Sequence, residues 1–115
     1  MGKFVMRQVS TGVKFDLLAG NGEVIATSEV YKSAAACRKG MQSVAKNAPV
    51  AAVEDLCDSG SAAPNPKFQI FQDKAGQFRF RLRSRNGAVI AVSEGYITKE
   101  ACLKGIESVR SNTKE

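Results

Sequence analysis

The sequence predicts an α+β fold, in which two tandem β-β-β-α(-β) repeats form one antiparallel sheet unit with the helices packed on one face. Three observations support this prediction. An Asn-Gly pair between apolar residues occurs twice, at Asn21-Gly22 and Asn86-Gly87. A segment with helical periodicity follows each pair, and corresponding residues lie about 65 positions apart. At 115 residues, neither half is long enough to bury a sufficient core alone, so the halves are expected to share one.

The first half, residues 1–57, is expected to contain three strands, a helix and a short fourth strand. The strands are predicted at residues 3–9, 14–20 and 23–28, where apolar and polar side chains alternate. A type I′ turn is expected at the Asn-Gly pair, because this turn needs positive φ at both central positions. Residues 50–56 are short and apolar, and they are the candidate for the fourth strand.

The helix of the first half is expected to begin after Ser33, a residue type favoured at helix N-caps. Its apolar stripe has the spacing i, i+3, i+4 and i+7, and consists of Cys37, Gly40, Met41 and Val44. The helix should end before Pro49, since proline disfavours helical backbone in the residue before it. A glycine in mid-helix costs up to ~1 kcal/mol relative to alanine. Gly40 is therefore expected to mark a close approach of helix and sheet.

A linker at residues 58–66, rich in Ser, Ala and Pro, leads to the second half, residues 67–115. This half repeats the pattern of the first. Strands are predicted at 67–73, 78–85 and 88–93, and Thr98 is expected to cap a helix with the stripe Cys102, Gly105, Ile106 and Val109. Six polar residues follow this stripe, and the sequence leaves open whether they form a last strand.

Residue types exclude several classes of function. The chain has no histidine, and Cys37, Cys57 and Cys102 are widely spaced. Histidine-dependent catalysis is therefore excluded, and neither a zinc site nor a disulfide framework is expected. Apolar runs are too short to cross a bilayer, and no secretory signal is expected. We expect a reduced, cytoplasmic protein without metal, cofactor or membrane contact, in which Cys37 and Cys102 are buried as small hydrophobic residues.

Several short motifs occur in an order that is similar to a known family. They are Lys67-Phe68, Phe78-Arg79-Phe80-Arg81-Leu82, Asn86-Gly87, Val89-Ile90-Ala91, Ser93-Glu94-Gly95-Tyr96 and Gly105-Ile106-Glu107-Ser108-Val109. In this pattern the chain resembles the YegP-like family of small tandem-repeat bacterial proteins of unknown function. The first half matches less well, because Val30 replaces the glycine before the tyrosine. The resemblance implies β-β-β-α-β units that build one sheet and exchange their fourth strands. It implies no catalytic residues.

Positive charge is concentrated in the second half, where residues 66–115 carry 10 basic and 5 acidic side chains. The period of two along strand 78–85 predicts a row of arginines on one face, formed by Arg79, Arg81, Arg83 and Arg85. Phe71 is expected on the same face. This face is interpreted either as an anion- or nucleic-acid-binding surface with Phe71 as a stacking platform, or as a solvated surface whose arginine stems cover apolar neighbours.

The sequence specifies no particular function. We expect a small, monomeric, non-enzymatic protein-interaction module, whose sheet face or exposed edge meets a protein partner. The alternative is weak, sequence-independent binding of nucleic acid or another anion through the arginine face. An enzyme is not expected, because phosphate-loop motifs are absent. Glu29 and Glu94 are interpreted as serving turns rather than as a catalytic carboxylate pair, and Tyr31 and Tyr96 as packing where each helix begins.

Overall fold

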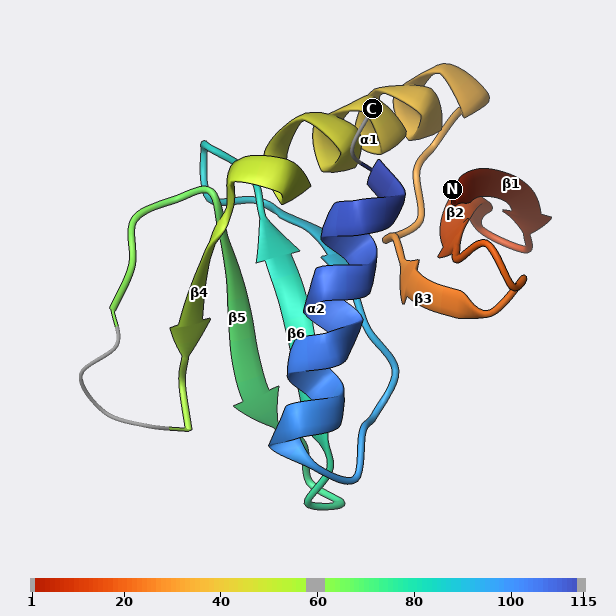
Figure 1. Cartoon of the computed structure of the whole chain (residues 1–115). Coiled ribbons are helices and arrows are strands. Elements are labelled where there is room, and N and C mark those ends of the chain that lie inside the picture. The colour runs from red at the N-terminus through yellow and green to blue at the C-terminus, as the bar shows by residue number, and fades with distance from the viewer. Residues whose placement is uncertain (1, 58–61, 114–115) are drawn as a thin grey trace.

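The computed structural model describes residues 2–57 and 62–113, which form one seven-stranded sheet and two helices (Figure 1). The order of the strands in the sheet is β1-β2-β3-β7-β6-β5-β4. The bounds are β1 Lys3–Val9, β2 Gly12–Leu18, β3 Val24–Thr27, α1 Ala34–Asn47, a 3₁₀ turn Ala48–Val50, β4 Ala52–Asp55, β5 Lys67–Gln72, β6 Phe78–Arg83, β7 Val89–Val92 and α2 Lys99–Thr113. The predicted α+β class is therefore confirmed.

The sheet is not wholly antiparallel, and this corrects the prediction. β4 runs parallel to β5, from Ala52 opposite Lys67 to Asp55 opposite Ile70, whereas the other pairs are antiparallel. A parallel pair arises because β4 follows the first helix and adds to the outer edge of the second half. The fourth strand of the first half thus lies against the second half, as the family resemblance implied.

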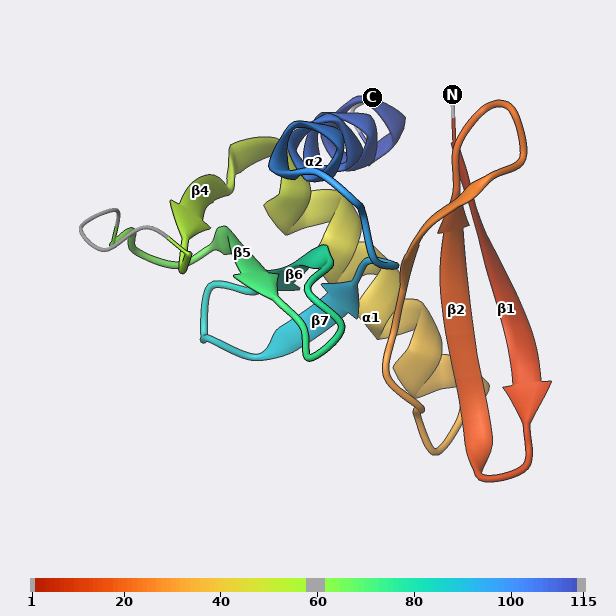
Figure 2. The same cartoon turned by 90° about the horizontal axis from the view of Figure 1, so that it is seen from below.

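The two helices join the halves into one core. α1 contacts β2 of its own half and β7 of the other, while α2 contacts β6 and β3. Figure 2 shows both helices lying alongside the strands of the second half. The largest fully buried side chains are Phe15, Leu17, Cys37, Val44, Phe68, Ile70, Phe80, Leu82, Cys102, Ile106 and Val109. Both predicted helix stripes face this core, with Met41 packed at its margin.

The two Asn-Gly turns are hairpin turns, but not of the predicted type I′. Gly22 and Gly87 have φ of 88° and 89°, whereas Asn21 and Asn86 keep negative φ. The amide of Gly22 donates to the carbonyl of Ala19 at 2.9 Å, and the strand register shifts beside the turn. This geometry is a type I turn followed by a left-handed glycine. The Asn21 side chain accepts the Glu23 amide at 3.0 Å, which favours the right-handed conformation of Asn21.

Gly40 and Gly105 mark close helix–sheet approach, as predicted. A Cβ atom at Gly40 would lie 2.6 Å from Tyr31 Cζ and 3.1 Å from Phe15 Cε2. The corresponding distances at Gly105 are 2.8 Å to Tyr96 Cζ and 3.1 Å to a ring carbon of Phe80. Each tyrosine stacks on the phenylalanine below it. The tyrosine rings therefore pack against the middle of each helix rather than where it begins, which corrects the prediction, and a methyl group at either glycine would require the ring to shift.

Element ends follow the predicted caps more closely than the predicted strand ends. Ser33 and Thr98 accept backbone amides at the start of the helices, at 3.1 Å in each case. α2 continues to Thr113, so residues 110–113 are helical, and residues 114–115 lie outside the described residues. Of the predicted linker 58–66, residues 58–61 lie outside the described residues. In the part of the chain that the structure describes, neither helix is long and apolar enough to cross a membrane.

Candidate functional site

Three of the four predicted arginines lie on one strand and one face of the sheet, opposite the buried Phe80 and Leu82. Each donates through Nε to a neighbour: Arg79 to Asp73 at 2.7 Å, and Arg81 and Arg83 to the same Gln69 oxygen at 2.7 and 2.6 Å. We call this surface the arginine face. Its cations are therefore part of an internal polar network.

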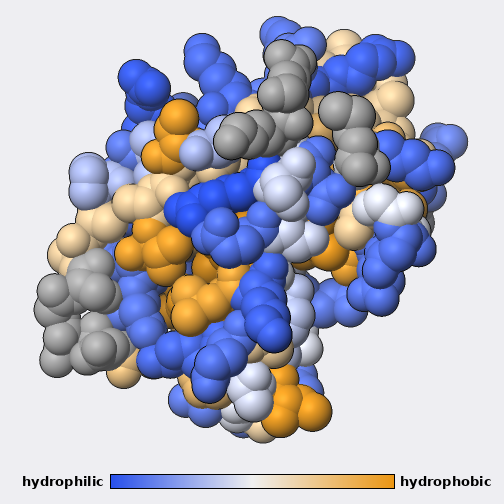
Figure 3. Space-filling model, viewed as in Figure 1, coloured by the Kyte–Doolittle hydropathy of each residue, from blue (hydrophilic) through white to orange (hydrophobic). Residues whose placement is uncertain are grey.

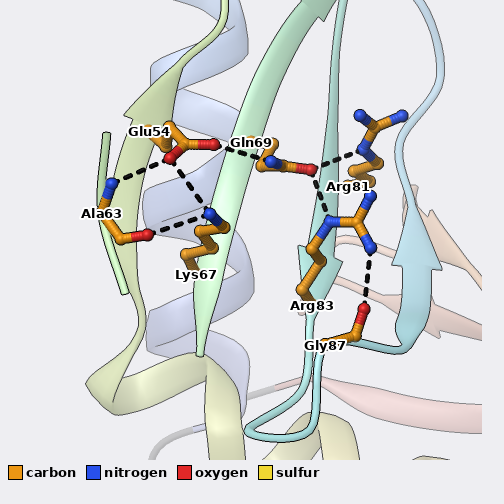
Figure 4. A network of polar contacts seen from close by, with 7 residues as sticks. All are labelled: Glu54, Ala63, Lys67, Gln69, Arg81, Arg83 and Gly87. Carbon is orange, nitrogen blue, oxygen red and sulfur yellow. Dashed lines mark hydrogen bonds and ion pairs between the residues drawn. The ribbon is translucent and has the colours of Figure 1, made fainter. Parts of the chain in front are cut away.

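Gln69 connects the arginine face to Glu54 on the edge strand β4 (Figure 4). Its amide donates to Glu54 at 2.6 Å, while the second Glu54 oxygen accepts the Ala63 amide at 2.8 Å and the Lys67 ammonium at 3.0 Å. These donors, Gln69 first, lower the pKa of Glu54 to about 2. Glu54 is 6% exposed. The carboxylate is thus ionised and fully occupied, which suits fixing β4 to the sheet rather than proton transfer.

Phe71 lies on the arginine face as expected, but its ring is already covered. The guanidinium carbon of Arg81 lies 4.8 Å from the ring centroid, which is a cation–π contact. Burial, and then the charge of Arg83, lower the pKa of Arg81. A base could stack on Phe71 only after Arg81 moves away.

Arg85 is separated from the other three arginines, which corrects the predicted row of four. β6 ends at Arg83, and the type I turn that follows takes Arg85 out of the strand. Arg85 instead lines a hollow of about 480 Å³ formed by residues of α1 and of the β6–β7 turn. Figure 1 shows this turn near the C-terminal end of α1. The lining residues are Lys39, Gln42, Ser43, Lys46, Asn47, Ser84, Arg85 and Asn86. We call this site the basic hollow.

The β1 strand is an edge of the sheet, and within the described residues it pairs with β2 alone. On β2, Val13 and Phe15 direct their backbone groups to the other neighbour, because they bond to Tyr31 and Ser28. Backbone groups of successive residues in an antiparallel strand point to opposite sides. In the register of β1 with β2, the N–H and C=O groups of Phe4 and Met6 therefore point away from the sheet.

The cysteines do not assemble into a site. Cys37 and Cys102 are buried, as predicted, and burial raises the pKa of Cys102 to about 11. Cys57 is exposed, and its pKa is also raised, by burial first and then by the charge of Asp55. A thiol with a raised pKa is a poor nucleophile at neutral pH.

The model of the family described as "Domain of unknown function (DUF1508)" matches residues 10–55 and 73–115. The chain belongs to this family. A UPF0339 protein of Bordetella pertussis is 40% identical over 111 residues, which cover 96% of this chain and 87% of that protein. A UPF0339 protein of Methanosarcina acetivorans is 56% identical over 46 residues, 40% of this chain and 79% of that protein. This relative is therefore only about half as long as the present chain.

Two solved structures share the fold. The solution NMR structure of yegP from E. coli, a protein of unknown function, has a TM-score of 0.79 and 31% identity, and the match covers 99% of this chain and 87% of that one. A UPF0339 protein from Shewanella oneidensis has the same TM-score and 30% identity, with coverage of 99% and 86%. The YegP-like resemblance is confirmed, and the function of the family is unknown.

The sequence analysis did not single out Glu54, which bonds to Gln69 beside the arginine face, or Lys39 and Lys46, which line the basic hollow. Glu54 and Asp55 are two adjacent acidic residues within an otherwise apolar segment, and this pair was the available signal. Lys39 and Lys46 look like ordinary solvated helix residues. Comparison of the halves would have drawn attention to Lys46, because the residue 65 positions later is Ser111.

Proposed function

We propose that this chain is a small non-enzymatic protein-interaction module that binds an extended peptide segment along the free edge of β1. The observation that carries the proposal is the way β4 is held at the other edge. There, β4 adds to β5 as a parallel strand over Ala52–Asp55. Strand addition to an exposed edge is a common mode of peptide recognition, since backbone hydrogen bonds supply affinity and alternate side chains supply specificity.

β1 offers a ligand nearly the same surroundings as β5. Phe4 of β1 meets Phe15 edge-to-face with ring centroids 5.4 Å apart, and Phe68 of β5 meets Phe80 in the same way at 5.7 Å. We infer that residues 1–57 and 67–115 are tandem repeats of one unit. Under this inference β1 is the strand-accepting edge of the first repeat, as β5 is of the second.

The chemistry of β4 indicates the chemistry of the ligand. Val53 packs against the core, and the next residue, Glu54, bonds to Lys67 at 3.0 Å. Lys3 is the counterpart of Lys67. Lys3 pairs with Leu18, and Lys67 pairs with Arg83, which lies 65 positions after Leu18. A ligand strand with an apolar residue followed by an acidic one would therefore place its carboxylate beside Lys3. We propose a partner segment of this kind.

Other surfaces support a protein partner less well. On the side of the molecule seen in Figure 3, apolar side chains form a few small groups that hydrophilic side chains separate. On the arginine face, Arg79, Arg81 and Arg83 already donate to Asp73 and Gln69. These bonds hold the guanidinium groups against the sheet and leave fewer N–H donors for a nucleic acid. We also propose a cytoplasmic location, in keeping with the free thiols of Cys37, Cys57 and Cys102.

The test uses a labelled peptide with the sequence of residues 50–57 and Cys57→Ser, titrated into the isotope-labelled full chain. We expect weak binding, with Kd on the order of 10⁻⁴ M, or about 5.5 kcal/mol. Amide shifts should centre on residues 3–6. The amides of Ala52 and Leu56 donate to the carbonyls of Pro66 and Ile70 in the native pair. N-methylation of these two amides should therefore abolish binding.

A peptide N-methylated at Val53 and Asp55 is the matched control, because those amides point away from the accepting strand. It should bind as the unmodified peptide does. Lys3→Glu should weaken binding, and a peptide carrying Glu54→Lys should restore it. Equal binding of the two methylated peptides, or shifts centred on β5 or on the arginine face, would exclude strand addition at β1.

A further inference from the structure

We propose that the basic hollow binds the phosphate group of a small phosphorylated molecule. The hollow lies between the first helix and a turn of the second half, so both halves of the chain are needed to form it. Three of its lining side chains, Lys39, Lys46 and Arg85, are cationic, and none of its eight lining residues is acidic.

The three cations have no internal partners. In residues 2–57 and 62–113, no hydrogen bond or ion pair involves the side chains of Lys39, Lys46 or Arg85. This distinguishes them from Arg79, Arg81 and Arg83 on the arginine face. A cluster of like charges without counter-ions raises the local concentration of anions, because the repulsion among the cations is relieved when an anion binds.

The uncharged groups of the hollow favour an anion as well. The Asn47 amide nitrogen donates to the carbonyl and hydroxyl oxygens of Ser43, at 2.8 and 3.1 Å. The Ser84 hydroxyl donates to the Asn86 side-chain oxygen, which also accepts the Ala88 amide. The side-chain oxygens of Ser43 and Asn86 are thus used internally as acceptors, whereas the Asn86 amide nitrogen is left as a donor. An oxyanion needs donors around it.

The corresponding region of the other half lacks this chemistry. At a separation of 65 positions, Lys104 corresponds to Lys39, but Glu107 corresponds to Gln42, Ser111 to Lys46 and Gly20 to Arg85. One cation and one carboxylate thus replace three cations. Glu107 is moreover bonded to Arg110. Solvation of the helix surface alone would favour charged residues equally on both helices. It therefore does not explain why three cations gather at α1 and not at the corresponding region of α2.

The size of the hollow selects a ligand larger than phosphate alone. Its volume of about 480 Å³ lies within the range of roughly 300–1,000 Å³ typical of small-molecule sites. A phosphate group held by the cations would leave room for an organic group against the polar helix surface. A phosphate monoester carries close to two negative charges at neutral pH, which matches the surplus of positive charge.

The experiment is an NMR titration of the full chain with AMP and, separately, with inorganic phosphate, at constant ionic strength in sodium chloride. Amide shifts should centre on residues 39–47 and 84–87, with AMP binding more tightly than phosphate. Lys46→Gln and Arg85→Gln should each weaken AMP binding about two- to fivefold, as loss of one exposed charge contact does. The triple variant with Lys39→Gln should lose roughly tenfold or more.

Lys104→Gln is the matched control, since Lys104 on α2 corresponds to Lys39 on α1 and is also exposed. This variant should bind AMP as the original chain does. Equal affinity for phosphate and AMP would contradict the selection of a ligand larger than phosphate. Absence of binding by both probes would overturn the proposal. So would unchanged affinity in the triple variant, or shifts centred on Arg79, Arg81 and Arg83.

Discussion

The two halves of the molecule share their core contacts and differ in their polar surfaces. In the first half Phe15 stacks on Tyr31 beneath Gly40, and in the second Phe80 stacks on Tyr96 beneath Gly105. The centroid distances, 6.3 and 6.4 Å, are nearly equal. Packing of this kind tolerates little change, because a close-packed interior has no space for extra atoms.

The faces of the sheet opposite the helices show the contrast. In the first half Asp16 accepts Arg7 at 2.8 Å and Thr27 at 2.6 Å. The corresponding residue of the second half is Arg81, which carries the opposite charge and bonds to Gln69. The polar groups are satisfied in each half, but by different partners: a salt bridge in the first half and a hydrogen bond to an amide in the second. The comparison teaches that the common core fixes the fold, while each half is free to develop its own surface chemistry.

The largest effect is expected when the halves are separated. β4 needs β5, and each helix contacts a strand of the other half. The full chain should therefore unfold in one cooperative transition, and residues 1–57 alone should be unfolded or should dimerise. Urea unfolding followed by two probes, with sedimentation of the fragment, tests this. A folded monomeric fragment would show that the halves have independent cores.

Replacement of the helix glycines tests whether the two cores are equivalent. Gly40→Ala and Gly105→Ala should each destabilise the chain by about 1–3 kcal/mol, because the new methyl group collides with a tyrosine ring. Adding Tyr96→Phe to Gly105→Ala should recover part of the loss. Urea denaturation measures both effects. A gain of up to ~1 kcal/mol, as helix propensity alone would give, would contradict close packing.

The smallest effect is expected from Glu54 and is confined to acid. Its pKa falls from 4.5 to about 2 on folding, so its contribution is present above pH 4.5 and is lost as the pH falls toward 2. The stability difference between the original chain and Glu54→Gln should therefore shrink across this range. Urea midpoints at several pH values measure it. A difference independent of pH would contradict the lowered pKa.

Local patterns in the sequence determined most of the elements. The alternation in residues 3–9 and 67–73, the helix caps Ser33 and Thr98, and the two glycines each depend on interactions within a few residues or on a repeated spacing. Such signals can be read without knowing the partners of a segment. They predicted the strands, the helices and the close approach at Gly40 and Gly105 that the structure contains.

The tertiary structure alone decided the features on which the two proposals rest. Alternation along 78–85 continued through Arg85 in the sequence, but the turn ended β6 at Arg83 and moved Arg85 beside α1. The parallel pairing of β4 and the basic hollow join segments far apart in the chain, and the position of β1 at the sheet edge depends on the order of all seven strands. Pairing of this kind depends on burial and geometry shared by both partners, and neither segment carries that information by itself.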